Sequence, residues 1–215
     1  MITIAQKDLK AVSLAMAKND IRYYLKGVFI EFNRAETRIV ATDGHRLHMV
    51  RTVDSSAMVI EPVTFIIPSE MVKHCLKAKA ARHDKNPQIT LNFSNGKVEA
   101  ILPDGSTFAA PALDGTFPDY RRIIQQCVSG KSDIEAAVYN PRYVLDAMDA
   151  LETYADHKGS DPIGTGIRQL GSHVAVLTWG DFLAMVMPMR ADASPMPCPS
   201  LAKPLEIPAA LPVSA

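Results

Sequence analysis

The sequence predicts an α+β fold in which helices cover one face of antiparallel sheet. Two observations predict this class. A unit made of a short apolar strand, an amphipathic helix and then several strands recurs along the chain. In its strand-rich parts, Asn95-Gly96 and Asp104-Gly105 are dipeptides typical of tight hairpin turns, which join antiparallel neighbours. A helix packed against such a sheet belongs to the α+β class.

Each predicted unit begins with a strand that leads directly into a helix. Ser69 and Asn140 are good N-caps for the second and third helices, and Pro141 occupies a first-turn position, where proline is tolerated. Each helix has an apolar side, as helices that face a core do. The strand and helix of each unit are expected at residues 2–5 and 6–12, 65–69 and 70–76, and 137–141 and 142–151.

Runs with the pattern of strands, separated by turn residues, follow each helix. Those of the first unit are expected at residues 27–30, 38–42 and 46–51. Those of the second are expected at residues 88–93, 97–102 and 107–110. Those of the third are expected at residues 173–178 and 182–187, joined at Gly180-Asp181. From residue 191 the chain is rich in proline and poor in charge, which predicts an extended, disordered tail.

Composition excludes several classes of protein. Apolar residues make up 47% and charged residues 21%, as in ordinary globular proteins, and no stretch approaches the roughly 20 apolar residues of a membrane span. The first ten residues lack the pattern of a secretory signal. Cys75, Cys127 and Cys198 lack zinc-site spacing and are expected to be free thiols in a reducing cytoplasm. Basic and acidic residues balance at 23 each, so any contact with nucleic acid is expected to be confined to one face.

Four segments resemble one known family in its own order. They are RYYLKG…RIVATDGHRLHMV (22–50), ALDGTFPDYRRII (112–124), YNPRYVLDAMDAL (139–151) and AMVMPMR (184–190). The first two are similar to the second domain of the bacterial DNA polymerase III beta sliding clamp, and the last two to the second half of its third domain. The resemblance implies a shortened chain with the DNA-clamp fold, and such compaction suggests a phage or mobile-element origin.

The resemblance also implies a division of the chain. Residues 1–125 would form a complete clamp-like domain of two repeat units, residues 126–190 a half domain of one unit, and residues 191–215 the proline-rich tail. The link between the two folded parts is expected at residues 125–133.

The motif ATDGHRL, residues 41–47, has two interpretations. From its residues alone it is a structural turn at Asp43-Gly44. The resemblance implies instead that it helps to line an apolar groove that binds short peptides of polymerases and clamp loaders. By matching positions, the groove would be built by Leu25, Thr42, Gly44, His45, Arg46, Leu47, Pro118, Arg122, Asn140, Tyr143, Met185, Val186, Met187, Pro188, Met189 and Arg190.

The resemblance implies contact with double-stranded DNA as well, through a loop at the inner rim and through helices that line the central hole. Lysines give the first two helices the positive charge that phosphates attract, whereas Asp146, Asp149 and Glu152 make the third helix acidic. The expected DNA-binding residues are Arg22, Tyr23, Tyr24, Lys7, Lys10, Lys73, Lys77 and Arg82.

Three functions remain open from the sequence. The first is a non-enzymatic processivity factor that binds DNA polymerase III and clamp-loader subunits and forms a homo-oligomer, a ring of four if twelve units close it. The second is a decoy or adaptor that binds clamp partners without encircling DNA. The third, an enzyme that uses Asp43 and His45, has no evident nucleophile, and no cofactor or metal is expected. A further hypothesis has the tail fold back into the groove.

Overall fold

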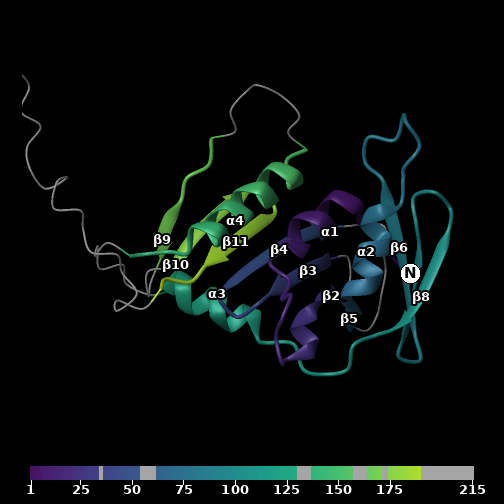
Figure 1. Cartoon of the computed structure of the whole chain (residues 1–215), viewed down its shortest axis with the longest axis horizontal. Helices are drawn as coiled ribbons and strands as arrows, with labels where there is room; N and C mark the ends of the chain where they lie inside the picture. The colour runs from purple at the N-terminus through teal and green to yellow at the C-terminus, as the bar shows by residue number, and fades with distance from the viewer. Residues whose placement is uncertain (34–35, 54–61, 130–136, 157–163, 171–173, 190–215) are drawn as a thin grey trace, which may run out of the picture.

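The computed structural model describes residues 1–33, 36–53, 62–129, 137–156, 164–170 and 174–189. Figure 1 shows two sheets with helices packed against them. The strands are β1 (Ile2–Ala5), β2 (Gly27–Asn33), β3 (Glu36–Thr42), β4 (Arg46–Val53), β5 (Val63–Pro68), β6 (Gln88–Ser94), β7 (Lys97–Ile101), β8 (Thr107–Pro111), β9 (Arg168–Leu170), β10 (Val174–Trp179) and β11 (Phe182–Val186). The helices are α1 (Gln6–Ser13), α2 (Ser69–Lys77), α3 (Tyr120–Ser129) and α4 (Pro141–Tyr154), with a 3₁₀ turn, η1 (Tyr23–Lys26).

The strands form a four-stranded sheet in the order β1-β6-β7-β8 and a seven-stranded sheet in the order β5-β2-β3-β4-β11-β10-β9. Every pairing is antiparallel, which confirms the predicted α+β class. The first two units exchange their first strands, because β1 pairs with β6 and β5 pairs with β2. This exchange ties the two units into one body.

The third unit extends the sheet of the first. Strand β11 lies beside β4 over five residue pairs, from Phe182 opposite Val50 to Val186 opposite Arg46. The last strand of the chain therefore lies against a strand that is more than a hundred residues away in sequence. This seam positions the candidate site described below.

Helices α2, α1 and α4 lie side by side on one face of the seven-stranded sheet (Figure 1). Strand side chains alternate between the two faces, so Ile39 and Val50 pack under these helices. Val40 and Leu47 point to the opposite face, where they pack with Phe117 and Tyr120 at the start of α3. The large sheet is thus covered on both faces where the third unit joins the first.

Local expectations are confirmed at most helix and hairpin positions. The Asn140 side chain accepts a hydrogen bond from the backbone N–H of Arg142, and Pro141 begins α4 as expected. Asn95 and Gly96 adopt positive φ angles of 51° and 72°, as a tight hairpin turn requires. The prediction for Ser69 is wrong, because Pro68 is the N-cap of α2 and no side chain caps that helix.

Two further expectations are corrected. A strand is expected at residues 137–141, but residues 137–140 have no regular secondary structure and Pro141 begins α4; the N–H of Met189 donates to the carbonyl of Val138 without a strand forming there. Residues 125–129 of the expected link belong to α3, because Ile123, Ile124 and Cys127 form an apolar side that packs on the sheet. The rest of the link and the expected tail lie outside the described residues, and so does His173, the first residue of the strand expected at 173–178.

Candidate functional site: an apolar cavity at the seam of the large sheet

A cavity of about 200 Å³ lies where β4 and β11 meet the start of α3. Its lining is mainly apolar and comes from segments far apart in the sequence. It is lined by Arg22, Leu25, Thr42, Gly44, Arg46, Leu47, Pro118, Ile123, Met185 and Met187. The volume falls below the roughly 300–1,000 Å³ of sites for small molecules, so it suits one or two apolar side chains of a partner.

The turn between β3 and β4 forms one wall of the cavity. The Thr42 hydroxyl donates to the carbonyl of Arg46 over 2.6 Å and accepts from the N–H of Gly44 over 3.0 Å. Asp43 accepts from the N–H groups of His45 and Arg46. Gly44 has a φ of +90° and the Arg22 guanidinium packs against it, so a side chain here would be both strained and crowded. Polar side chains thus hold this wall in a single conformation.

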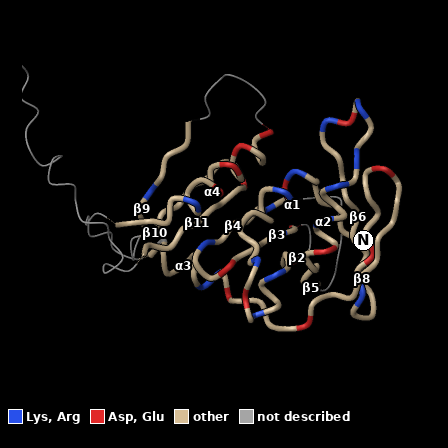
Figure 2. Tube along the Cα trace, viewed as in Figure 1, with Lys and Arg blue, Asp and Glu red and all other residues tan. Residues whose placement is uncertain are grey.

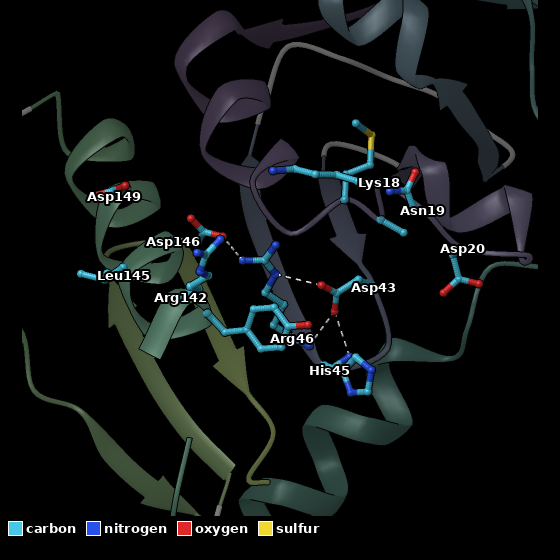
Figure 3. Close-up of a pocket in the computed structure, with 13 residues that line it drawn as sticks. Lys18, Asn19, Asp20, Asp43, His45, Arg46, Arg142, Leu145, Asp146 and Asp149 are labelled. Atoms are coloured by element: carbon cyan, nitrogen blue, oxygen red, sulfur yellow. Dashed lines mark hydrogen bonds and ion pairs between the residues drawn. The ribbon is translucent and has the colours of Figure 1, made fainter. Parts of the chain in front are cut away.

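Arg46 connects the turn to the third unit (Figure 3). Its side chain is 5% exposed and forms ion pairs with Asp43, at 3.0 Å, and with Asp146 on α4. Its guanidinium carbon lies 4.5 Å from the ring centroid of Tyr143, within cation–π range. The ring of Tyr143 in turn stacks on His45, with 6.1 Å between centroids. These contacts fix the turn against α4.

The segment that follows β11 forms the opposite wall. Met187 donates its backbone N–H to the carbonyl of His45 over 2.8 Å, which continues the β4–β11 pairing past the last residue of β11. Met185 pairs with Leu47 and is 2% exposed, while Met187 is half-buried. Methionine side chains are flexible and polarisable, and they adapt to different apolar partners.

The structure brings together the turn, Leu25 and the methionines, but not every predicted groove residue reaches the cavity. Val186 is fully buried on the helix-covered face, because strand side chains alternate. Asn140 caps α4, and Arg122 is exposed on α3. His45, Tyr143, Pro188 and Met189 lie outside the cavity lining, while Arg190 lies outside the described residues.

Two lining residues were not among the predicted groove residues. Ile123 comes from α3, and its spacing to Cys127 is the helical signal that could have revealed it. Arg22 is also one of the expected DNA-binding residues, and its guanidinium donates hydrogen bonds to Asp20 and to the carbonyl of Asp43. Hydrogen bonds from Arg22 lower the pKa of Asp20 to about 2.

The other expected DNA-binding residues lie mostly on or near the helix face. Figure 2 shows basic residues along α1 and in the connection between α2 and β6, and acidic residues on α4. Lys10, Lys73, Lys77 and Arg82 are exposed, whereas the Lys7 ammonium lies 5.7 Å from the ring centroid of Tyr154. Tyr23 is 52% exposed on η1, and the neighbouring Tyr24 packs edge-on against it.

The described residues provide no cluster of three or more side chains suited to a metal ion. Cys75 and Cys127 are both free and buried, while Cys198 lies outside the described residues. Burial raises the pKa of the Cys75 thiol to about 11, so it stays protonated. Among the described helices, none has the length and apolar character required to cross a bilayer.

Comparison with solved structures identifies the fold. The DNA polymerase III subunit beta of Pseudomonas aeruginosa superposes with a TM-score of 0.63 and 22% identity, covering 88% of this chain and 66% of that one. A sliding clamp of the same organism bound to griselimycin gives a TM-score of 0.61 and 22% identity, with coverage of 88% and 65%. The chain therefore has the fold of sliding clamps.

Sequence comparisons agree with the structural ones. The beta sliding clamp of Pseudomonas aeruginosa is 32% identical over 126 residues, which are 57% of this chain and 33% of the relative. The beta sliding clamp of Escherichia coli K12 is 31% identical over 120 residues, 54% of this chain and 30% of the relative. The match thus spans about a third of each relative's length. Because the family model described as the central domain of the DNA polymerase III beta subunit matches residues 3–119, the chain belongs to the DNA polymerase III beta subunit family.

Proposed function

We propose that the chain is a sliding-clamp-like processivity factor of DNA replication. It docks short apolar peptides of DNA polymerase III and clamp-loader subunits in the cavity at the seam, while its helix face lies on double-stranded DNA. The observation that carries the proposal is the convergence of Leu25, Leu47, Pro118, Met185 and Met187 on one small cavity. These residues come from four segments that are far apart in the sequence.

The cavity has the features that a peptide site requires. Its lining is mainly apolar, and the Arg22 guanidinium adds a polar group to it. Two apolar anchors of a peptide contribute about 1.5–3 kcal/mol each before ordering costs are subtracted. Micromolar affinity, about −8 kcal/mol, is therefore expected.

The DNA contact is proposed to be weak and electrostatic. Lys10 on α1, Lys73 and Lys77 on α2 and Arg82 beyond it are exposed and can reach phosphates. The acidic α4 limits this contact to the first two units. The affinity should therefore fall steeply with salt and show no sequence preference.

A homo-oligomeric ring is the proposed assembly. The four-stranded sheet ends at β1 and β8 and the seven-stranded sheet at β5 and β9, and no described strand pairs with the outer edge of β8 or of β9. Open strand edges pair readily with another chain, so head-to-tail contact of these ends would close a ring, four chains giving twelve units. Native mass spectrometry measures the assembly directly, and a strict monomer would refute the ring.

Peptide binding tests the groove. A labelled hexapeptide with two large apolar side chains is titrated with the protein, and binding is followed by fluorescence polarisation. Met187→Lys should abolish binding, because it places a charge in the cavity. Met189→Lys is the matched control, since Met189 is 41% exposed and does not line the cavity. Equal losses in both variants would contradict the assignment.

Retention on closed circular DNA separates the processivity factor from the decoy. A protein that encircles DNA stays on a closed circle and is released when the circle is cut. Peptide binding without this topological dependence would favour the non-encircling decoy or adaptor, and would leave the peptide groove intact as a proposal.

A further inference from the structure

A second hollow, of about 540 Å³, lies at the opposite end of β4 from the peptide cavity. It is bounded by the start of α1, the end of α4, the last residues of β4 and the turn between β10 and β11. Of the residues that line it, only Lys7 is among the expected DNA-binding residues, and none belongs to the proposed peptide groove. Its lining includes Lys7, Asp8, Arg51, Tyr154 and Trp179.

Aromatic rings form one side of the hollow. Trp179 is the single tryptophan of the chain and is 41% exposed at the end of β10. Tyr154 is held in place by stacking on the buried Phe182, with 5.6 Å between centroids. Gly180 has a φ of +55°, and the Tyr154 hydroxyl lies 3.5 Å from the position that a Cβ at Gly180 would occupy. That distance is an ordinary contact, so it is the positive φ, rather than lack of space, that favours glycine in this turn beside Tyr154.

Charged groups complete the lining. The Lys7 ammonium lies over the Tyr154 ring, and Arg51 is held by Glu36 at 2.9 Å and by Asp181 at 3.4 Å. Asp8 is 6% exposed, and its Oδ1 has no hydrogen-bond partner among the described residues. A buried carboxylate oxygen without a donor is costly, and a ligand that brings an N–H group into the hollow can offset this cost.

We propose that this hollow binds one unpaired base of single-stranded DNA, which stacks on the exposed Trp179 and directs an exocyclic amino group to Asp8. The adjoining phosphate meets Lys7, with Lys10 one turn further along α1. Aromatic stacking beside a cation is the usual means of holding an unpaired base. A cationic peptide fits less well, because it would have to approach the positive charges of Lys7 and Arg51.

The inference rests on the proposed function, in that the hollow opens at the ends of α1 and α4, beside the face proposed to lie on duplex DNA. It adds a distinct ligand and a base preference. A carboxylate accepts hydrogen bonds and cannot donate them, so Asp8 favours cytosine, which carries an amino group at N4, over thymine, which carries an acceptor at O4.

The single tryptophan makes the test direct. The full chain is titrated at pH 8 with the 12-mers dC12 and dT12, and Trp179 fluorescence should be quenched by both, at lower concentration by dC12. In polarisation assays with labelled dC12, Trp179→Ala should weaken binding by about 5- to 150-fold, the range for loss of one base–aromatic stack. Ile101→Ala, which removes another exposed apolar side chain outside the hollow, should leave the affinity unchanged.

Asp8→Asn keeps the size of the side chain and provides the second variant. It should bring the affinities for dC12 and dT12 together, while circular dichroism verifies folding. Absence of quenching by either oligonucleotide, or unchanged dC12 affinity in Trp179→Ala, overturns the inference. Retention on circular duplex and peptide polarisation are measured on the same proteins. If these survive while the single-strand results fail, the inference alone is wrong; if they fail while quenching persists, the proposed clamp function is wrong.

Discussion

Two buried ionisable groups should make the stability of the protein depend on pH in opposite ways. His48 on β4 is fully buried, and its Nδ1–H donates to the carbonyl of Ala11 over 3.1 Å, because a carbonyl can only accept. Its Nε2 and the Oδ1 of Asp8 on α1 have no hydrogen-bond partner within the described part of the chain. Burial lowers the pKa of His48 from 6.5 to about 4 and raises the pKa of Asp8 from 3.8 to about 6.

The sign of each effect follows from which state binds the proton. Between pH 6.5 and 4 the unfolded chain protonates His48 and the folded protein does not, so this group lowers the unfolding free energy as the pH falls. Between pH 6 and 3.8 the folded protein protonates Asp8 and the unfolded chain does not, so this group raises the unfolding free energy as the pH falls. Each of these pKa changes corresponds to roughly 3 kcal/mol of unfolding free energy.

The perturbation is to remove one group at a time. In Asp8→Asn, only the His48 effect remains, so the unfolding free energy relative to wild type should fall by about 3 kcal/mol between pH 7.5 and 4. In His48→Asn, whose amide can still donate to Ala11, the same difference should rise by about 3 kcal/mol over this range. The double variant should follow the wild type, apart from a constant offset.

Urea denaturation followed by circular dichroism at pH 7.5, 6 and 4 measures these differences. Carboxylates elsewhere whose pKa is lowered, such as Asp20 and Asp104, contribute equally to all variants and cancel in the comparison. The reasoning would be refuted if both single variants showed the pH dependence of the wild type, or if both changed in the same direction.

Three further predictions concern the seam and the packing around it. Asp146→Asn should lower the unfolding free energy by about 1 kcal/mol, since it removes an ion-pair partner of the buried Arg46. Asp149 is exposed, so Asp149→Asn should change the unfolding free energy by less than about 0.5 kcal/mol in the same denaturation assay. Phe117→Ala should lower the unfolding free energy by about 3 kcal/mol, because the ring stacks on Phe29 with 4.7 Å between centroids. It should also weaken peptide binding measured by polarisation, because Pro118 beside it lines the cavity. Unchanged peptide affinity would contradict this link. Gly27→Ala should lower the melting temperature, because its Cβ would lie 2.5 Å from the Ile67 carbonyl oxygen, while Gly164→Ala, in open space, should have no effect.

Local chemistry allowed much of the fold to be predicted. The N-cap at Asn140 and the Asn95-Gly96 turn depend on neighbouring residues alone, and both form as expected. The exchange of β1 and β5 between units depends on pairing across many residues, which hydrophobic periodicity does not specify. The helix α3 was missed because Ile123 lies in the segment 112–124, which was read only for its resemblance, while Cys127 was assigned to the link at 125–133.

The candidate site was predictable for a different reason. Periodicity alone assigns Leu47 and Met185 only to strands, and it gives no sign that the two residues pair. The resemblance supplied that proximity. It could not show that Arg22 is held by Asp20, or that Val186 faces the helices, because both depend on how this chain packs.

The structural and the functional interpretations of the ATDGHRL motif are compatible. Thr42 and Asp43 form hydrogen bonds with backbone groups of the turn, which is the structural role. These bonds make the wall of the cavity rigid. Arg46 then fastens that wall to α4, so the cavity exists only while the third unit is paired with the first. A peptide that binds here therefore stabilises the seam by mass action, since it binds the joined state alone. Peptide docking and the integrity of the β4–β11 seam should accordingly be coupled.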